Sequence, residues 1–301
     1  MFKYDEVHFV CSIDPDQGQI HEPCYTVMVL VQTVKEMWTI LRRYRIILPP
    51  EHGSWSLMLT PFVIGVGVAR QLNAAALACA VAALSLFLLR QPIILWWRVE
   101  SRKARASDSP TARFWALLLA VILMGSGTVL LALDRWSVLW LAIPAVLILV
   151  ITSSLTLRQG TRKLLIEIIG SVGLALTAPA GYVASSGMLD KTTWVVWGIA
   201  ATYNALSVLY VRLRVDDRHG RATQELFWVV IVSHGTALFL ALVVGAAGHL
   251  PYWVALPFAL LFIRALYVSW RKPPIRNIKR FGFAEMGVAL VFAAVIIIFQ
   301  I

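Results

Sequence analysis

Nine apolar stretches, each 19 to 24 residues long, constrain this chain more than any other feature. They occupy approximately residues 51–69, 74–97, 113–133, 136–156, 164–186, 193–213, 225–246, 250–270 and 282–300. About 18–20 apolar residues suffice for an α-helix to cross a hydrocarbon core of about 30 Å. The alternation typical of a membrane β-barrel is absent, and a lipid-exposed open sheet would leave backbone groups unsatisfied. The sequence therefore predicts an all-α, polytopic membrane helix bundle of about nine transmembrane helices.

The composition agrees with a chain embedded in lipid. Hydrophobic residues make up 59% of it and charged residues 14%, which is too little charge to cover the surface of a soluble domain of this size. The formal net charge of +11 is typical of many nucleic-acid-binding proteins. Here, however, the basic residues lie in short loops between apolar stretches rather than on one amphipathic face. We therefore expect the lipid bilayer as the partner, and no nucleic acid.

Lysine and arginine residues concentrate in alternate loops. There are 23 before the first stretch or around the second, fourth, sixth and eighth loops, whereas the other loops hold three, which are Arg70, Arg135 and Lys191. Basic residues in short loops favour the cytoplasmic side of a membrane. This pattern predicts a multi-pass protein of the bacterial cytoplasmic (inner) membrane, with its amino terminus inside and its carboxyl terminus outside.

Residues 1–36 differ from the remainder of the chain. They contain six of the sixteen acidic residues, and their apolar stretch 25–34 is too short to span a membrane. Met37 precedes Trp38 and a basic run, as a translation start would. Two interpretations of 1–36 stay open, which are an N-terminal extension with an interfacial segment at 25–34 and a stretch that lies upstream of the natural start. In both, 37–301 is the nine-helix transmembrane domain.

Ionisable residues within the stretches gather at their cytoplasmic ends. They are Glu51, His52, Arg90, Glu167, Arg212, Glu225, Arg264 and Glu285. Such residues are costly in a bilayer and are functional candidates by default. The alternative is helix-end chemistry, in which carboxylates at N-termini and arginines at C-termini complement the helix dipole. This alternative explains Arg212 well, but it explains Arg90 and Glu167 less well, because both lie among apolar residues.

The densest motif is Pro50-Glu51-His52-Gly53-Ser54-Trp55, with Pro61 following. Glu51 suits a helix N-terminus, and His52 could transfer a proton or bind an anionic head group. An ordinary capped helix start is the alternative. His234, near mid-bilayer, is interpreted as a buried histidine hydrogen-bonded to a neighbouring helix rather than as a haem or metal ligand.

No metal or cofactor site is expected. Cys11, Cys24 and Cys79 form no metal-binding spacing, and the pair Asp216-Asp217 is weak evidence for magnesium.

The opening motif and the turn Leu89-Arg90-Gln91-Pro92 resemble the YwiC-like family of bacterial membrane proteins, over roughly residues 45–300. A more remote resemblance is to the UbiA-type prenyltransferases, in the order of Pro50, Pro61 and Gly65 and in the run 167–182. That resemblance implies nine helices with a cytoplasmic active site.

UbiA-type enzymes hold a prenyl diphosphate through magnesium with two aspartate-rich motifs. The first position here reads Gln91-Pro92 and then apolar residues to Trp97, without a carboxylate. The second, around Tyr210, has Ser207 and Arg214 where the family carries aspartates. Magnesium needs such oxygen ligands. We therefore expect no magnesium-dependent prenyl transfer, although a divergent UbiA-like prenyltransferase stays an alternative.

The sequence thus leads to a hypothesis of a cytoplasm-facing cavity that binds an isoprenoid, quinone or other lipid. The candidate residues are Glu51, His52, Trp55, Arg90, Glu167, Tyr210 and Arg212. Two alternatives stay open, which are a permease for a small anion and a membrane scaffold without its own ligand. A permease would be expected to have broken helices, for which Pro144, Pro179 and Pro257 mark candidate positions.

Overall fold

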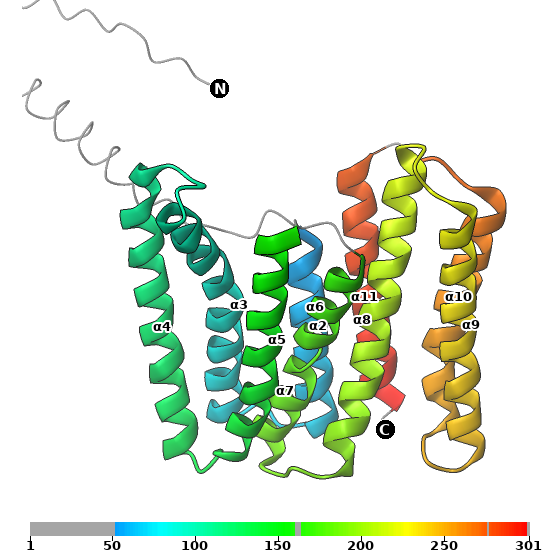
Figure 1. Ribbon diagram of the computed structural model, residues 1–301. Helices are drawn as coiled ribbons and strands as arrows, with labels where there is room; N and C mark the ends of the chain where they lie inside the picture. The colour runs from blue at the N-terminus through cyan, green and yellow to red at the C-terminus, as the bar shows by residue number, and fades with distance from the viewer. Residues whose placement is uncertain (1–51, 160–163, 276, 300–301) are drawn as a thin grey trace, which may run out of the picture.

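The computed structural model describes residues 52–159, 164–275 and 277–299, and these residues fold into helices joined by short loops (Figure 1). The α-helices are α2 (His52–Ala69), α3 (Ala74–Glu100), α4 (Ser109–Ala132), α5 (Ser137–Gln159), α6 (Leu164–Leu174), α7 (Thr177–Ser186), α8 (Lys191–Arg218), α9 (Gln224–Ala246), α10 (Ala255–Arg271) and α11 (Ile278–Phe299). Short 3₁₀ turns precede α4 and α10, at Ala106–Asp108 and Tyr252–Val254.

Each of the nine predicted stretches corresponds to one span in this structure. Eight described segments are long and apolar enough to cross a membrane, with α6 and α7 together forming one of them. The ninth is the shorter apolar helix α2. Figure 1 shows the spans standing side by side. The predicted all-α, multi-pass membrane bundle is confirmed.

Polar side chains in the loops fix where the spans begin. Asn73 accepts a hydrogen bond from the backbone N–H of Ala76 (2.9 Å) at the start of α3. Asp190 and Thr193 form a capping box at the start of α8, in which each side chain accepts from the other residue's backbone N–H (3.2 and 3.1 Å). These caps satisfy amide groups that a helix leaves unpaired in its first turn. They explain why few residues suffice to separate adjacent spans.

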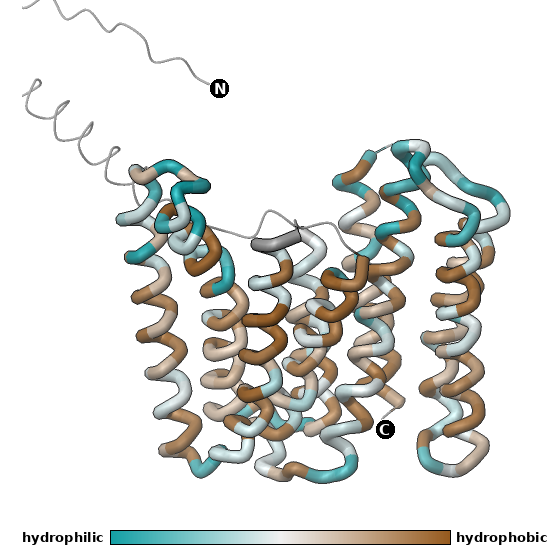
Figure 2. The backbone as a smooth tube through the Cα atoms, viewed as in Figure 1, coloured by the Kyte–Doolittle hydropathy of each residue, from teal (hydrophilic) through white to brown (hydrophobic). Residues whose placement is uncertain are grey.

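The helices are largely apolar along their length, and hydrophilic residues gather toward their ends (Figure 2). Many of the apolar side chains are exposed on the outside of the bundle. On α4, for example, Leu117, Val121 and Met124 are 63%, 68% and 69% exposed. A soluble protein would not expose such a continuous apolar surface, whereas lipid tails solvate it well.

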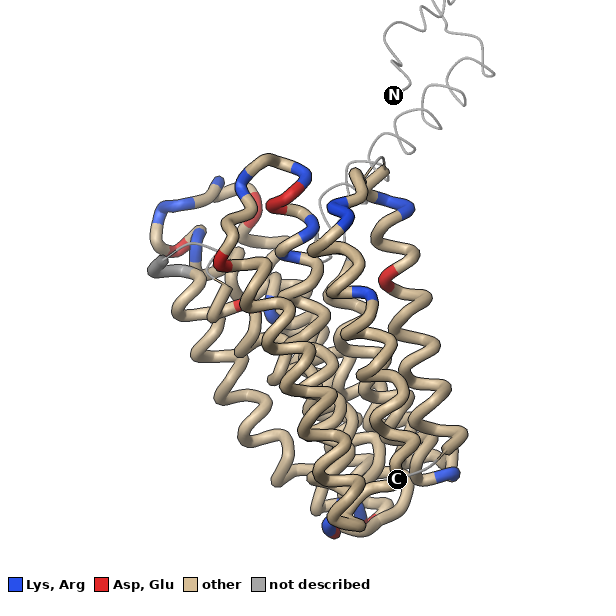
Figure 3. The backbone as a smooth tube through the Cα atoms, turned by 90° about the vertical axis from the view of Figure 1, so that its right-hand side faces the viewer, with Lys and Arg blue, Asp and Glu red and all other residues tan. Residues whose placement is uncertain are grey.

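Charged residues lie at the two ends of the bundle and are far more numerous at one of them (Figure 3). We call this the charged end; there α3, α5, α8 and α10 finish and α4, α6, α9 and α11 begin. The opposite end carries Arg70, Arg135 and Lys191, which are the three basic residues that sequence analysis separated from the others.

Close backbone contact between α2 and α7 organises the centre of the bundle. A side chain at Gly65 would overlap the carbonyl group of Ala178, and a Cβ atom at Gly181 would lie 3.0 Å from the carbonyl oxygen of Phe62. Glycine is required where two helices approach this closely. Helix α2 also packs against α11, while the antiparallel hairpins α3–α4 and α9–α10 flank the centre (Figure 1).

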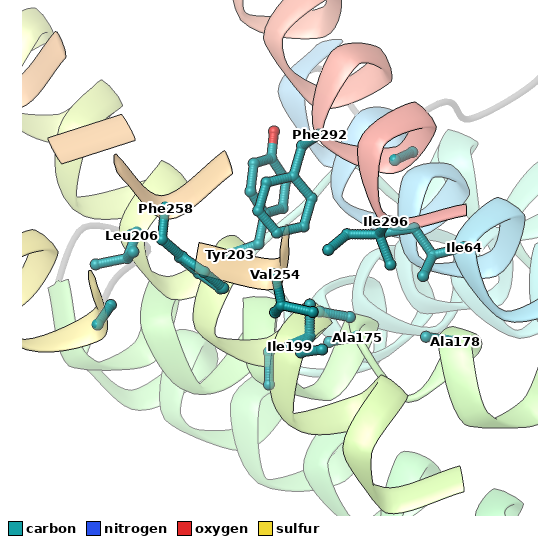
Figure 4. Close-up of a cluster of buried hydrophobic side chains, with 14 of the residues drawn as sticks. Ile64, Ala175, Ala178, Ile199, Tyr203, Leu206, Val254, Phe258, Phe292 and Ile296 are labelled. Atoms are coloured by element: carbon teal, nitrogen blue, oxygen red, sulfur yellow. The ribbon is translucent and has the colours of Figure 1, made fainter. Parts of the chain in front are cut away.

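An aromatic core joins α8, α10 and α11 (Figure 4). Tyr203 stacks on Phe292 with 4.3 Å between ring centroids, and Phe258 meets Phe292 edge-on at 5.4 Å. Ile64 of α2 and Ile296 of α11 extend the same buried cluster. This core holds the charged ends of α8, α10 and α11 beside one another.

The fifth span is interrupted, because α6 ends at Leu174 and α7 begins at Thr177. Pro179 lies in the first turn of α7, where its missing N–H costs no hydrogen bond, so the break precedes the proline. Of the other candidate positions, Pro144 lies inside α5, which continues through it, whereas Pro257 lies in the first turn of α10, as Pro179 does in α7.

Candidate functional site at the charged end

A network of ion pairs links α6 to α8 at the charged end. Arg212 pairs through Nη1 with Glu167 Oε1 (3.1 Å) and through Nε with Asp216 Oδ2 (2.8 Å). Arg221 contacts the second oxygen of Asp216 (3.3 Å). The side chains of Arg212 and Glu167 are 27% and 32% exposed, so the pair lies at the boundary of the bundle rather than in its dry interior. The structure thus brings together two of the residues that the sequence singled out.

Trp55 of α2 and Arg90 of α3 both lie in the part of their helix nearer the charged end. The Trp55 ring meets Phe87 edge-on with 5.3 Å between centroids. Arg90 follows Phe87 by almost one helical turn toward the charged end and is half-buried. Glu51 lies outside the described residues, as does the side chain of His52, whose backbone begins α2. Their predicted roles stay predictions.

Tyr210 belongs to a second group, on a different side of α8. The guanidinium group of Arg264 lies over the Tyr210 ring, 3.7 Å from its centroid, and donates from Nη2 to Glu285 Oε2 (2.8 Å). Tyr210 itself is 4% exposed. Both members of the ion pair lie within membrane spans, so the pairing offsets part of the cost of placing each charge there.

Arg214 extends this second group by one turn of α8. Its Nη2 donates to the carbonyl oxygen of Pro273 (2.8 Å), and its Nη1 lies 3.5 Å from Asp217 Oδ2. The guanidinium carbon lies 6.0 Å from the ring centroid of Phe281 in α11. We call Tyr210, Arg214, Arg264, Phe281 and Glu285 the α8–α10–α11 cluster.

Hydrogen bonds from a buried asparagine, Asn204, lie nearer the middle of the bundle, beside the break in the fifth span. Pro61 has no N–H to donate to the carbonyl oxygen of Leu57, and Asn204 Nδ2 donates to that oxygen instead (2.9 Å). The same amide donates to the carbonyl oxygen of Ser171 near the end of α6 (2.9 Å). Asn204 therefore fastens α8 to both α2 and α6.

The carboxylates that could hold a metal are engaged with arginines. Asp216 pairs with Arg212 and Arg221, and Asp217 with Arg214. Within the described ranges no three His, Cys, Asp or Glu residues are grouped so that they could hold a metal ion. What this charged end offers a ligand is guanidinium groups, which bind carboxylate or phosphate directly.

His234 is buried in α9, but its hydrogen bond differs from the prediction. Its Nδ1 lies 2.8 Å from the carbonyl oxygen of Val230, four residues earlier in the same helix. The predicted bond to a neighbouring helix is therefore wrong for this nitrogen. The backbone of its own helix supplies an acceptor at the right distance.

A shallow recess that has no room for a water molecule lies at the opposite end of the bundle. It is lined by Trp253, Val254, Val295, Ile296 and Phe299, none of which was predicted as a site residue. Pockets for small molecules usually measure about 300–1,000 Å³. We therefore assign no ligand to this recess.

The sequence predicted how deep the charged residues lie in the membrane spans, but not which residues they pair with. It placed Arg264 and Glu285 at the same end of consecutive spans, but it did not pair them or add Arg214 and Asn204 to the candidates. Equal depth on adjacent spans was the available signal for the Arg264–Glu285 pair. For Asn204 the signal was a carboxamide within an apolar stretch, together with a proline inside another.

Comparison with known proteins gives one match. Residues 48–182 match the family described as YwiC-like protein, which confirms the resemblance over that part of the chain. The matched segment begins just before the opening motif and ends in α7, so it includes Trp55, Arg90 and Glu167. No curated protein and no solved structure matches the chain.

Proposed function

We propose that this multi-pass membrane protein binds an amphipathic ligand, such as an isoprenoid, quinone or other lipid, at its charged end. The observation that carries the proposal is the Glu167–Arg212 pair, which lies between α6 and α8 with 32% of the Glu167 side chain and 27% of the Arg212 side chain exposed. An ion pair in this position can meet a polar head group from the aqueous side, while the apolar helices receive the tail. Arg90 supplies a second guanidinium group on α3.

The engagement of Asp216 and Asp217 by arginines supports ligand binding without magnesium. The positive-inside rule supports a cytoplasmic position for the charged end, and hence a bacterial cytoplasmic (inner) membrane with the amino terminus inside. If purified protein converted a prenyl diphosphate and a quinone precursor in the presence of magnesium, the divergent prenyltransferase would replace this proposal.

Lipid mass spectrometry on protein extracted with its native membrane tests the proposal. We expect a co-purifying amphipathic molecule that is depleted in Arg212→Gln and Arg90→Ala. Arg113→Gln is the matched control, because Arg113 lies in an exposed ion pair with Glu100 at the same end of the bundle. Equal retention of every molecule in all three variants would contradict ligand binding at this site.

A permease for a small anion is the second candidate function. It is favoured by the interruption of the fifth span beside Pro61 and Asn204, because interrupted helices accompany substrate sites in many transporters. Flux into proteoliposomes separates the two functions. A permease predicts anion uptake that falls in Arg90→Ala, whereas a protein that only binds a lipid predicts none.

A further inference from the structure

The α8–α10–α11 cluster contains two buried N–H groups for which the described part of the chain supplies no acceptor. The Nε atoms of Arg214 and Arg264 are both inaccessible and have no hydrogen-bond acceptor among the described residues. Arg214 as a whole is only 6% exposed. A buried donor without an acceptor is energetically costly, and more so when the group is charged. The cluster would therefore gain from an additional acceptor.

Both arginines are neighbours of Tyr210. Arg264 covers the Tyr210 ring, and Arg214 follows Tyr210 by four residues on the same face of α8. Glu285 hydrogen-bonds to Arg264, whereas the Asp217 oxygen lies 3.5 Å from Arg214, which is long for a charged hydrogen bond. The two carboxylates therefore leave part of the hydrogen-bonding capacity of Arg214 and Arg264 unused.

An oxyanion with several acceptor atoms suits such a pair of arginines. Guanidinium groups present N–H donors in a rigid planar fork that matches phosphate oxygens, and they remain charged at every physiological pH. Phosphate also accepts from two arginines at once, which a single carboxylate oxygen does poorly. The low dielectric of the surrounding helices strengthens such hydrogen bonds.

The surroundings of the cluster favour a phosphate that is carried by a lipid. Arg264 lies seven residues, or about 10 Å, before the end of α10, within the membrane span. Trp270 and Phe283 are 82% and 69% exposed on α10 and α11, where they offer apolar surface to acyl chains. Lys272, directly after α10, and Lys279, in the first turn of α11, add positive charge at the same end.

We propose that the α8–α10–α11 cluster binds the phosphate group of an anionic phospholipid. This site goes beyond the ligand site proposed above. Arg212 and Glu167 lie toward α6, whereas Tyr210 and Arg214 face α10 and α11.

Purified protein in nanodiscs of defined lipid composition tests the proposal. We expect phosphatidylglycerol to raise the melting temperature over pure phosphatidylcholine, which carries the same phosphate beside a compensating ammonium group. Native mass spectrometry should show retained phosphatidylglycerol, with affinity reduced at least tenfold in Arg214→Gln and in Arg264→Gln. Inorganic phosphate added to phosphatidylcholine discs should have little effect, and full stabilisation by it would overturn the lipid as the source.

Three further variants keep the test decisive. Glu285→Gln removes the competing carboxylate and should tighten phosphatidylglycerol binding, an effect that misfolding cannot imitate. Lys279→Gln, at the exposed start of α11, should change affinity less than twofold. A loss as large as that of Arg264→Gln would mean general surface attraction and overturn the site. Arg212→Gln should leave phosphatidylglycerol binding intact even if it abolishes the ligand binding proposed above, so the two proposals fail separately.

Discussion

The side-chain amide of Asn204 donates to the carbonyl oxygen of Leu57, which is the oxygen that Pro61 leaves without its helical partner. Asn204 is fully buried, and its second donated bond reaches Ser171, close to the break between α6 and α7. One side chain therefore compensates for a proline in one helix while fixing the end of another. These two hydrogen bonds fix α2, which contains Pro61, and the end of α6 against α8 in the middle of the bundle.

Asn204→Leu should destabilise the protein by about 1–3 kcal/mol, because two interhelical hydrogen bonds in membranes contribute about 0.6–1.7 kcal/mol each. Denaturation of purified protein in mixed detergent micelles measures the change. Thr202→Val is the matched control, since the Thr202 hydroxyl donates only within its own helix, to Gly198. A cost for Thr202→Val equal to that of Asn204→Leu would contradict the role assigned to Asn204.

Gly65→Ala should destabilise the bundle by about 1–3 kcal/mol, because overpacking forces neighbouring backbone to move. The added methyl group would overlap the Ala178 carbonyl, which belongs to α7 and cannot rotate away. Gly125→Ala in α4 provides the opposite expectation, since no atom lies within 4 Å of its Cβ position. That variant should be neutral or stabilise the helix by up to about 1 kcal/mol. Melting temperatures of the two variants should therefore shift in different directions or by clearly different amounts.

The number of spans and their alternating direction could be predicted because both depend on quantities that run along the chain. Hydropathy marks each span, and the Lys and Arg count distinguishes one end of the bundle from the other. The Glu167–Arg212 pair could be predicted only as two residues at equal depth. They are 45 residues apart, and their contact requires that α6 lie against α8.

Which helices adjoin depends on close packing, and packing leaves little trace in a single sequence. Gly65 is one glycine among 18, and only the structure shows that it meets Ala178. The break in the fifth span could be foreseen near Pro179 but not placed, because a proline in a first helical turn is compatible with several break positions. Pro144 shows that the same residue type can also be accommodated within a helix.

Arg212→Gln should cost more stability than Glu167→Gln. Arg212 joins Glu167 to Asp216, so its removal affects two carboxylates, whereas Arg212 retains Asp216 when Glu167 is changed. Because these side chains are partly exposed, we expect about 1 kcal/mol for Arg212→Gln and about half of that for Glu167→Gln. A double-mutant cycle by chemical denaturation should return a coupling of roughly 0.5 kcal/mol. Additive effects of the two substitutions would mean that the pair does not contribute to stability.

The direction of insertion can be tested with single cysteines on the two ends of the bundle. Leu72 is 74% exposed in the loop between α2 and α3, and Arg102 is exposed in the loop after α3. In a background with Cys11→Ser and Cys24→Ser and the buried Cys79 retained, we expect Leu72→Cys to react with a membrane-impermeant maleimide on intact cells. Arg102→Cys should react only after the membrane is opened, because the positive-inside rule places its loop in the cytoplasm. Labelling of Arg102→Cys alone on intact cells would invert the topology and move both proposed ligand sites to the outer face.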